Sequence, residues 1–417
     1  MNKNVIYKIL LFSGYLFIVC FPLNGQFFEY RSEESAAISW NGVTFYDARM
    51  LAAGGVSLLA SGPFSAVANP ALPAIIDHTS LGGSLDFVYF QAFQFWGVNQ
   101  GVLTAPSGLD DRHIGISGFS IIVPVKSIRL SMGWYLADIL EFPDFDQDDQ
   151  YWGYSGDFQG REDRYFMGIA FQLGNRFQLG TRLEYGTGQR SVDMVEHSFY
   201  EGGWYSFIEQ AESHSSRSLK ISVGMTVSLS SRWKLGAVFD YPLYAEIDRS
   251  VERLFENNFP SPSIHDYQSS QDDHSIPAKI KLAASYQVWQ KKYHSTTKKI
   301  ILAAEAAMVF WSSYSYEFFG ETLDRDLRNT PVAAFGIEYG CHSERFEYFL
   351  RAGYRLDSQP LKEPLTTVHA FSGGVGVAWK RFSGNLGMAY YTGSAGNQSQ
   401  NHFVFCSTVS YAFKGEK

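Results

Sequence analysis

The chain is poor in cysteine, in charge and in long apolar runs, and each shortage excludes a class of protein. Only two of its three cysteines, Cys341 and Cys406, lie beyond the first 25 residues, so a disulfide framework does not hold it together. Charged residues make up 18% of the chain, against about 25% in soluble domains. After residue 25 no stretch is long and apolar enough for a membrane helix. A formal charge of -8 without a basic patch argues against a nucleic-acid partner.

Aromatic residues are abundant instead, at 16%, and they fall within segments of alternating polarity. From Leu219 to Leu229 every odd position is apolar, while the even positions hold lysine, serine, glycine and threonine. A helix would scatter these residues around its circumference, so the period of two predicts a strand with one apolar face. Similar segments that end in aromatic residues are typical of strands that cross a membrane.

Fourteen such segments are predicted to be strands, each near the ~9–11 residues that a tilted membrane-crossing strand needs. They cover residues 80–91, 113–125, 128–137, 164–173, 176–186, 218–229, 232–242, 277–289, 298–311, 330–341, 346–357, 368–380, 382–392 and 401–413. Short turns alternate with long links, which are predicted to be loops at 138–163, 187–217, 243–276, 312–329 and 358–367. This asymmetry favours an all-β transmembrane antiparallel barrel of the outer membrane over a soluble sandwich.

The two ends of the chain fit export to that membrane. Lys3 and Lys8 precede an apolar stretch that closes at Pro22, so residues 1–25 are predicted to be a secretory signal peptide, cleaved before Gln26. The location expected from this is the outer membrane of a Gram-negative-type bacterium. The final segment ends in aromatic residues up to Phe413, which resembles the strand read by the barrel-assembly machinery.

Residues 26–79 do not alternate and are expected to lie somewhere other than in the lipid. They contain a stretch with Ala48-Arg49 and Gly54-Gly55, and a second stretch that ends in Asn69-Pro70-Ala71. Paired glycines permit positive φ or tight packing, and the proline forces an extended conformation on the residue before it. The open alternative is a periplasmic extension containing a turn.

These motifs resemble the amino-terminal hatch of the outer-membrane long-chain fatty-acid transporter family, of FadL and TodX type. The resemblance implies a fourteen-stranded barrel, here residues 80–417, with residues 26–79 folded inside it as a hatch. It also implies that hydrophobic molecules are caught at the outer face and leave sideways into the membrane. The related PorV-like barrels, adaptors of a protein secretion system, carry a similar stretch and remain the alternative.

Other patterns suggest weaker sites. Ile247, Val251, Leu254 and Phe255 recur at helical spacing, which predicts an amphipathic outer helix that serves either as a landing site for a lipid-like ligand or as packing for neighbouring loops. The aspartates between Asp144 and Asp149 lack the glycine and glutamate of a calcium loop, so no metal site is assigned. Ser and His near His197 and Ser213–Ser216 lack an identifiable third group, which leaves a barrel lipase as a third alternative.

Charged residues within strands are expected to face the lumen and to brace the hatch: Arg129, Arg182, Glu184, Lys220, Lys234, Asp240, Lys281, Glu305, Glu338, Arg351 and Arg355. The sequence therefore predicts a monomeric channel for small hydrophobic molecules such as long-chain fatty acids, working by passive diffusion. We expect no catalysis and no cofactor. Its expected partners are the hydrophobic solute, outer-membrane lipid and lipopolysaccharide, and the assembly machinery during insertion.

Overall fold

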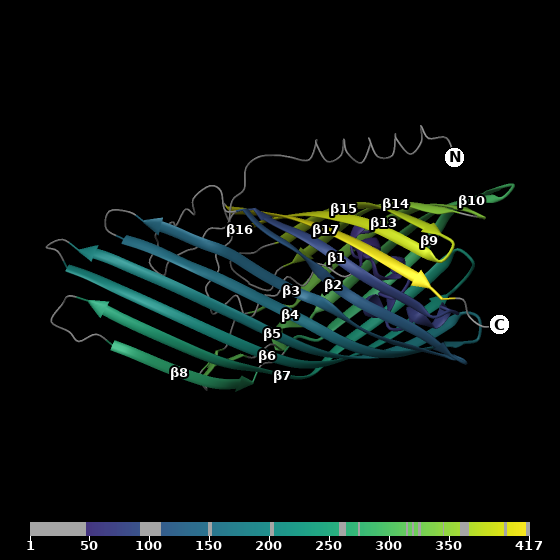
Figure 1. The fold of residues 1–417 in the computed structure, drawn as a ribbon. Helices are drawn as coiled ribbons and strands as arrows, with labels where there is room; N and C mark the ends of the chain where they lie inside the picture. The colour runs from purple at the N-terminus through teal and green to yellow at the C-terminus, as the bar shows by residue number, and fades with distance from the viewer. Residues whose placement is uncertain are drawn as a thin grey trace.

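The alternating segments form a closed antiparallel barrel (Figure 1). The computed structural model describes residues 47–91, 110–148, 152–200, 204–257, 264–273, 276–313, 316–318, 321–323, 327–344, 346–358, 367–395 and 398–413. No helix in these ranges is long and apolar enough to span a membrane. Within them Cys341 and Cys406 are free, and both are buried.

Fourteen strands of the described chain make up the ring. They are β1 (Ser80–Gln91), β2 (Asp110–Val125), β3 (Ile128–Asp148), β4 (Trp152–Leu173), β5 (Phe177–Tyr200), β6 (Trp204–Ser228), β7 (Trp233–Asn257), β9 (Lys279–Tyr293), β10 (Thr296–Val309), β13 (Thr330–Ser343), β14 (Glu347–Ser358), β15 (Thr367–Trp379), β16 (Phe382–Ala395) and β17 (Gln398–Ala412). Each predicted segment matches one of them, so the predicted barrel and its strand number are confirmed.

Pairing between β1 and β17 and between β6 and β7 closes the ring. A fifteenth strand, β8 (Ile264–Asp273), pairs with the upper part of β7, while β9 pairs with its lower part. The short strands β11 (Tyr316–Phe318) and β12 (Glu321–Leu323) form a separate hairpin.

The outward face carries a belt of exposed apolar side chains, which is stable only against lipid. On β4 the belt runs from Leu173 to Tyr165, both about half exposed. The next outward position holds Asp163, which pairs with Arg161 at 2.7 Å. The apolar belt therefore ends near Asp163, and most of β4 beyond it lies outside the membrane.

Strands β3 to β7 are much longer than the sequence pattern predicted. The predicted loops at 138–163, 187–217 and 243–276 are wrong in most of their length, because these residues continue the hairpins. β5 alone has 24 residues, about twice what a tilted strand needs to cross a bilayer. Together β3 to β8 form a wall on one side of the barrel. This wall extends beyond the ends of the shorter strands β13 to β17 (Figure 1). We call β3–β8 beyond the apolar belt the outer wall.

Residues 47–79, the inner segment, pack against the inward face of the barrel (Figure 1, purple). The inner segment consists of short helical turns joined by bends: α3 (Ala48–Ala52), η1 (Ser57–Leu59), α4 (Ser65–Ala68) and η2 (Leu72–Ile75). It lies towards the end of the barrel that carries the C-terminus. The predicted signal peptide and residues 26–46 lie outside the described residues.

Candidate functional site

The paired glycines of the inner segment touch the barrel backbone directly. Gly54 and Gly55 have φ of 72° and 83°, in the left-handed region that favours glycine. A Cβ on Gly54 would lie 2.6 Å from the carbonyl oxygen of Phe335 on β13. On β14, a Cβ on Gly353 would lie 2.0 Å from the backbone nitrogen of Gly54. Glycine on both sides of this contact lets the two backbones meet.

The Asn-Pro-Ala motif makes a similar contact with the opposite wall. A Cβ on Gly180 of β5 would lie 2.0 Å from the carbonyl oxygen of Pro70, and one on Gly224 of β6 would lie 2.2 Å from Oδ1 of Asn69. The same oxygen accepts a hydrogen bond of 3.0 Å from the backbone N–H of Ala71. Asn69 and Ala71 are fully buried. All five residues of the predicted hatch motif thus lie where the inner segment meets the barrel wall.

A side chain at this contact should destabilise the whole barrel. We expect Gly353→Val to force Gly54 off the wall, at a cost of about 1–3 kcal/mol or more, as in overpacked cores. Loss of the folded, compact band on heated gels should begin at a lower temperature than in the wild type. Gly384→Ala is the matched control, because nothing lies within 4 Å of its added Cβ. If the two variants lost the compact band at the same temperature, the close contact between Gly353 and Gly54 would be contradicted.

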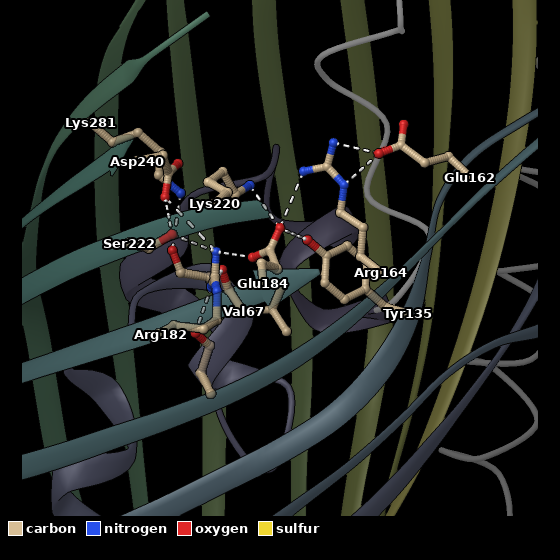
Figure 2. Close-up of polar contacts among 12 residues, drawn as sticks. Val67, Tyr135, Glu162, Arg164, Arg182, Glu184, Lys220, Ser222, Asp240 and Lys281 are labelled. Atoms are coloured by element: carbon tan, nitrogen blue, oxygen red, sulfur yellow. Dashed lines mark hydrogen bonds and ion pairs between the residues drawn. The ribbon is translucent and has the colours of Figure 1, made fainter. Parts of the chain in front are cut away.

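Arg182, on β5, fastens the inner segment to one wall (Figure 2). Its guanidinium donates to the carbonyl oxygen of Ala66 at 2.7 Å and to that of Val67. It also pairs with Glu184 at 2.6 Å and lies 3.9 Å from Asp240. Its side chain is 3% exposed, so these contacts are shielded from water. Arg182 thus ties two helix-end carbonyls to a buried ionic group.

Glu184 is the centre of that ionic group (Figure 2). Besides Arg182, it accepts a hydrogen bond of 2.8 Å from the hydroxyl of Tyr135 and pairs with Lys220 at 2.7 Å and with Arg164 at 3.2 Å. Several partners compensate the cost of burying this carboxylate. The group therefore joins strands β3 to β6 on the inward side of the barrel.

The opposite wall holds the start of the inner segment through Glu338, on β13. This carboxylate, which is fully buried, pairs at 2.8 Å with both Arg49 and Arg351. The two guanidinium carbons lie 5.3 and 4.9 Å from the ring centre of Phe349. Two cations thus share one carboxylate and one aromatic ring.

Asp47 begins α3 as its N-cap. Its carboxylate accepts hydrogen bonds from the backbone N–H groups of Arg49 and Met50 at 2.9 and 3.3 Å. Burial raises the pKa of this carboxyl, while those hydrogen bonds and the charge of Arg49 oppose the rise. Further along, the backbone N–H of Ser57 donates to Glu305 at 2.9 Å. The inner segment is therefore held by charged groups at both walls.

The barrel wall is interrupted between β2 and β3. Their ladder runs from Val125–Ile128 to Gly118–Tyr135, whereas β2 goes on pairing with β1 and β3 goes on pairing with β4. Just above the last rung, Ala137 is an extra residue in β3 with no partner on β4. Such a bulge bends a strand, and here it precedes the separation of the two edges. We call this interruption the wall break.

The predicted outer helix is not a helix. Residues 246–257 belong to β7, paired with β6 and β8, because their alternation with polar neighbours also suits a strand. Ile247 and Val251 are buried and share one face of β7 with the buried Arg249. Leu254 falls on the other face, and the side chain of Phe255 is outside the described residues. The four residues therefore do not form one apolar stripe.

Most of the charges predicted to face the lumen do contact the inner segment or its ionic anchors. Lys281 donates to the carbonyl of Ala68 at 3.1 Å, and Arg129 donates to that of Ile76. Three residues of the ionic group around Glu184 were not predicted: Tyr135, Arg164 and Glu162, which pairs with Arg164 at 2.7 Å. Glu162 had been placed in a loop and Arg164 at a strand end, while Tyr135 looked like one more apolar strand residue.

The Ser and His residues of the predicted loop 187–217 do not form a catalytic triad in the part of the chain that the structure describes. His214 pairs with Glu212 at 3.1 Å, both buried, while Ser213 is exposed on the other face of β6. Asp144–Asp148 lie in β3 rather than a loop, with side chains outside the described ones. No cluster of metal-binding side chains occurs among the described residues.

No family model and no curated protein matches the sequence. Solved structures do match. A FadL homologue from Pseudomonas aeruginosa superposes with a TM-score of 0.63 at 14% identity, over 89% of this chain and 99% of that one. The CymD monoaromatic hydrocarbon channel gives 0.61 at 15%, covering 89% and 100%, and the Pseudomonas putida toluene transporter TodX gives 0.60 at 13%, covering 89% and 99%. The resemblance to FadL and TodX is thereby confirmed at the level of the fold.

Proposed function

We propose that this barrel, which shares the fold of FadL- and TodX-type channels, is an outer-membrane channel for small hydrophobic molecules. Long-chain fatty acids are the substrate class we favour, moving by passive diffusion. The exposed apolar belt supports a place in the membrane, and the alternation of short turns with longer hairpins supports the outer membrane. The proposal includes no catalytic step.

The observation that carries the proposal is the wall break between β2 and β3. Below it, the inner segment is held against the inward face of the barrel by backbone contacts and buried ion pairs. A hydrophobic molecule that enters from outside therefore meets the inner segment before it can reach the periplasm. Moving sideways into lipid instead stabilises it by about 25 cal/mol per Å² of apolar surface removed from water. The wall break offers that exit.

In this scheme the inner segment acts as the hatch. Tyr135 lies on the last rung below the wall break and is hydrogen-bonded to Glu184, which in turn pairs with Arg182. A shift of residues 66–68 would therefore displace Arg182 and Glu184, and through them Tyr135 at the lower edge of the wall break.

Reconstitution tests the proposal. Purified protein in liposomes should speed the transfer of a fluorescent long-chain fatty acid to an acceptor trapped inside, relative to protein-free liposomes. A water-soluble sugar of similar mass should not be released faster, because in this proposal the inner segment blocks the lumen. Fatty-acid transfer at the protein-free rate would refute the channel.

The outer wall favours a second candidate, an adaptor of PorV type that holds a partner protein outside the cell. Its strands reach well past the apolar belt on one side only, as a flank against which another chain could pack. Mass spectrometry of the protein extracted from native membranes in mild detergent separates the two. A stoichiometric protein partner with no lipid-like ligand would favour the adaptor.

A further inference from the structure

The β9–β10 hairpin carries an unusual concentration of positive charge at the short-turn end of the barrel. Residues 287–299 include Lys291, Lys292, Lys298 and Lys299 and no acidic residue. The β7–β9 ladder ends at Trp233–Tyr286, so the last seven residues of β9 extend past the neighbouring strand. The basic tip therefore projects beyond the adjacent turn.

Two of these lysines face each other directly. Lys298 of β10 is the register partner of Lys291 of β9, and their ammonium nitrogens lie 5.6 and 4.7 Å from the centre of the same Tyr293 ring. Neither forms an ion pair with a carboxylate in the described part of the chain. Like charges directly across a strand pair are destabilising, and one ring offsets only part of that repulsion. An anion between the two ammonium groups would remove it.

This pair lies on the lipid-facing side of the hairpin. Alternation along β10 puts Lys298 on the same face as Leu302, an exposed member of the apolar belt. On β9 the same face carries Trp289 and Tyr293, which are 37% and 44% exposed. Partly exposed aromatic rings beside lysines are typical of the headgroup level of a bilayer.

We propose that Lys291 and Lys298 bind the phosphate of an anionic phospholipid, such as phosphatidylglycerol, in the inner leaflet of the outer membrane. The lipid's acyl chains would run along Trp289 and the apolar belt above it. A phospholipid is favoured over a free anion because the pair faces lipid rather than water. This inference rests on the orientation in the proposed function, in which short turns face the periplasm.

Native mass spectrometry of the full-length protein in detergent tests the site. The protein is equilibrated with equal amounts of phosphatidylglycerol and phosphatidylcholine, and the ratio of retained lipids is measured. For Lys291→Gln with Lys298→Gln we expect the preference for phosphatidylglycerol to fall by about twenty-five-fold, since each lysine near an anionic surface contributes roughly a factor of five. Lys291→Arg with Lys298→Arg should restore it.

Lys380→Gln with Arg381→Gln is the matched control. That turn also places an ammonium over an aromatic ring, Lys380 over Trp379 at 4.8 Å, but not as part of a pair facing across two strands. An unchanged lipid ratio in the double glutamine variant, or an equal loss in the control, would overturn the proposal. Displacement of the lipid by millimolar inorganic phosphate would also overturn the proposal. Fatty-acid transfer measured on the same samples reports separately on the channel.

Discussion

Deleting Ala137 is expected to reduce fatty-acid transfer in liposomes to the rate of protein-free vesicles. Leu136 pairs with Asp163 and Asp138 with Glu162, so Ala137 is the one residue in excess at this point of the β3–β4 ladder. Without it, Leu136 and Asp138 would stay opposite Asp163 and Glu162, and the β3–β4 ladder would run on without a bulge. Without this bend β3 could pair further with β2, whose own extra residue, Ser117, lies just above Gly118, and that pairing would narrow the wall break.

The deletion has a control within the same barrel. Val288 is the extra residue of β9 opposite Ile300 and Ile301, but the β9–β10 ladder continues on both sides of it. Its deletion should leave transfer unchanged, because no edge is freed by that bulge. Folding of both deletion variants is checked on gels, where the folded barrel gives a compact band that is lost on heating. Full transfer by the folded Ala137 deletion would mean that the hydrophobic solute does not use this opening.

Replacing Arg182 with methionine is expected to loosen the inner segment and to destabilise the barrel. Met preserves much of the side chain's bulk but leaves Glu184 and Asp240 without their shared cation and the Ala66 carbonyl without its donor. Breaking a buried pair on one side costs about 3–5 kcal/mol. The free energy of unfolding in detergent should fall by that order, and ion conductance across planar bilayers should rise as the lumen opens.

Arg217→Met serves as the comparison. Arg217 lies on the outer wall, its side chain is 55% exposed, and it is 3.8 Å from both Glu246 and Asp248. Exposed pairs of this kind contribute about 0–1 kcal/mol, so neither stability nor conductance should change much. If Arg182→Met behaved like Arg217→Met in both measurements, Arg182 would not be an anchor of the inner segment.

Where the barrel meets lipid, the sequence was sufficient to predict its strands and their faces. Leu219 to Leu229 alternates because one face contacts acyl chains and the other a polar lumen, and the structure places all of it but Leu229 in β6. Above the membrane that contrast disappears. On β5, Gln189 and Asp193 face water while the inward residues are also mixed, so the pattern resembles a loop although the backbone is a strand.

The anchors of the inner segment were only half predictable. Arg182 and Glu338 stood out as charges within otherwise apolar strands, and a charge there must face the lumen. Their partners did not stand out, because pairing depends on register around the whole ring. Tyr135 meets Glu184 only because β3, β4 and β5 align at that height. A pattern read along one strand carries no information about that alignment.

The close fit between the wall glycines and the inner segment constrains the order of assembly. The inner segment precedes every strand in the chain, yet its backbone touches Gly180 on β5, Gly353 on β14 and Gly387 on β16. A Cβ added at these three glycines would lie 2.0 to 2.2 Å from backbone atoms of the inner segment, so this fit exists only when β5, β14 and β16 are all in place. The inner segment, although it comes first in the chain, can therefore complete its packing only once the last strands of the barrel have formed. Its final position thus depends on strands from both halves of the chain.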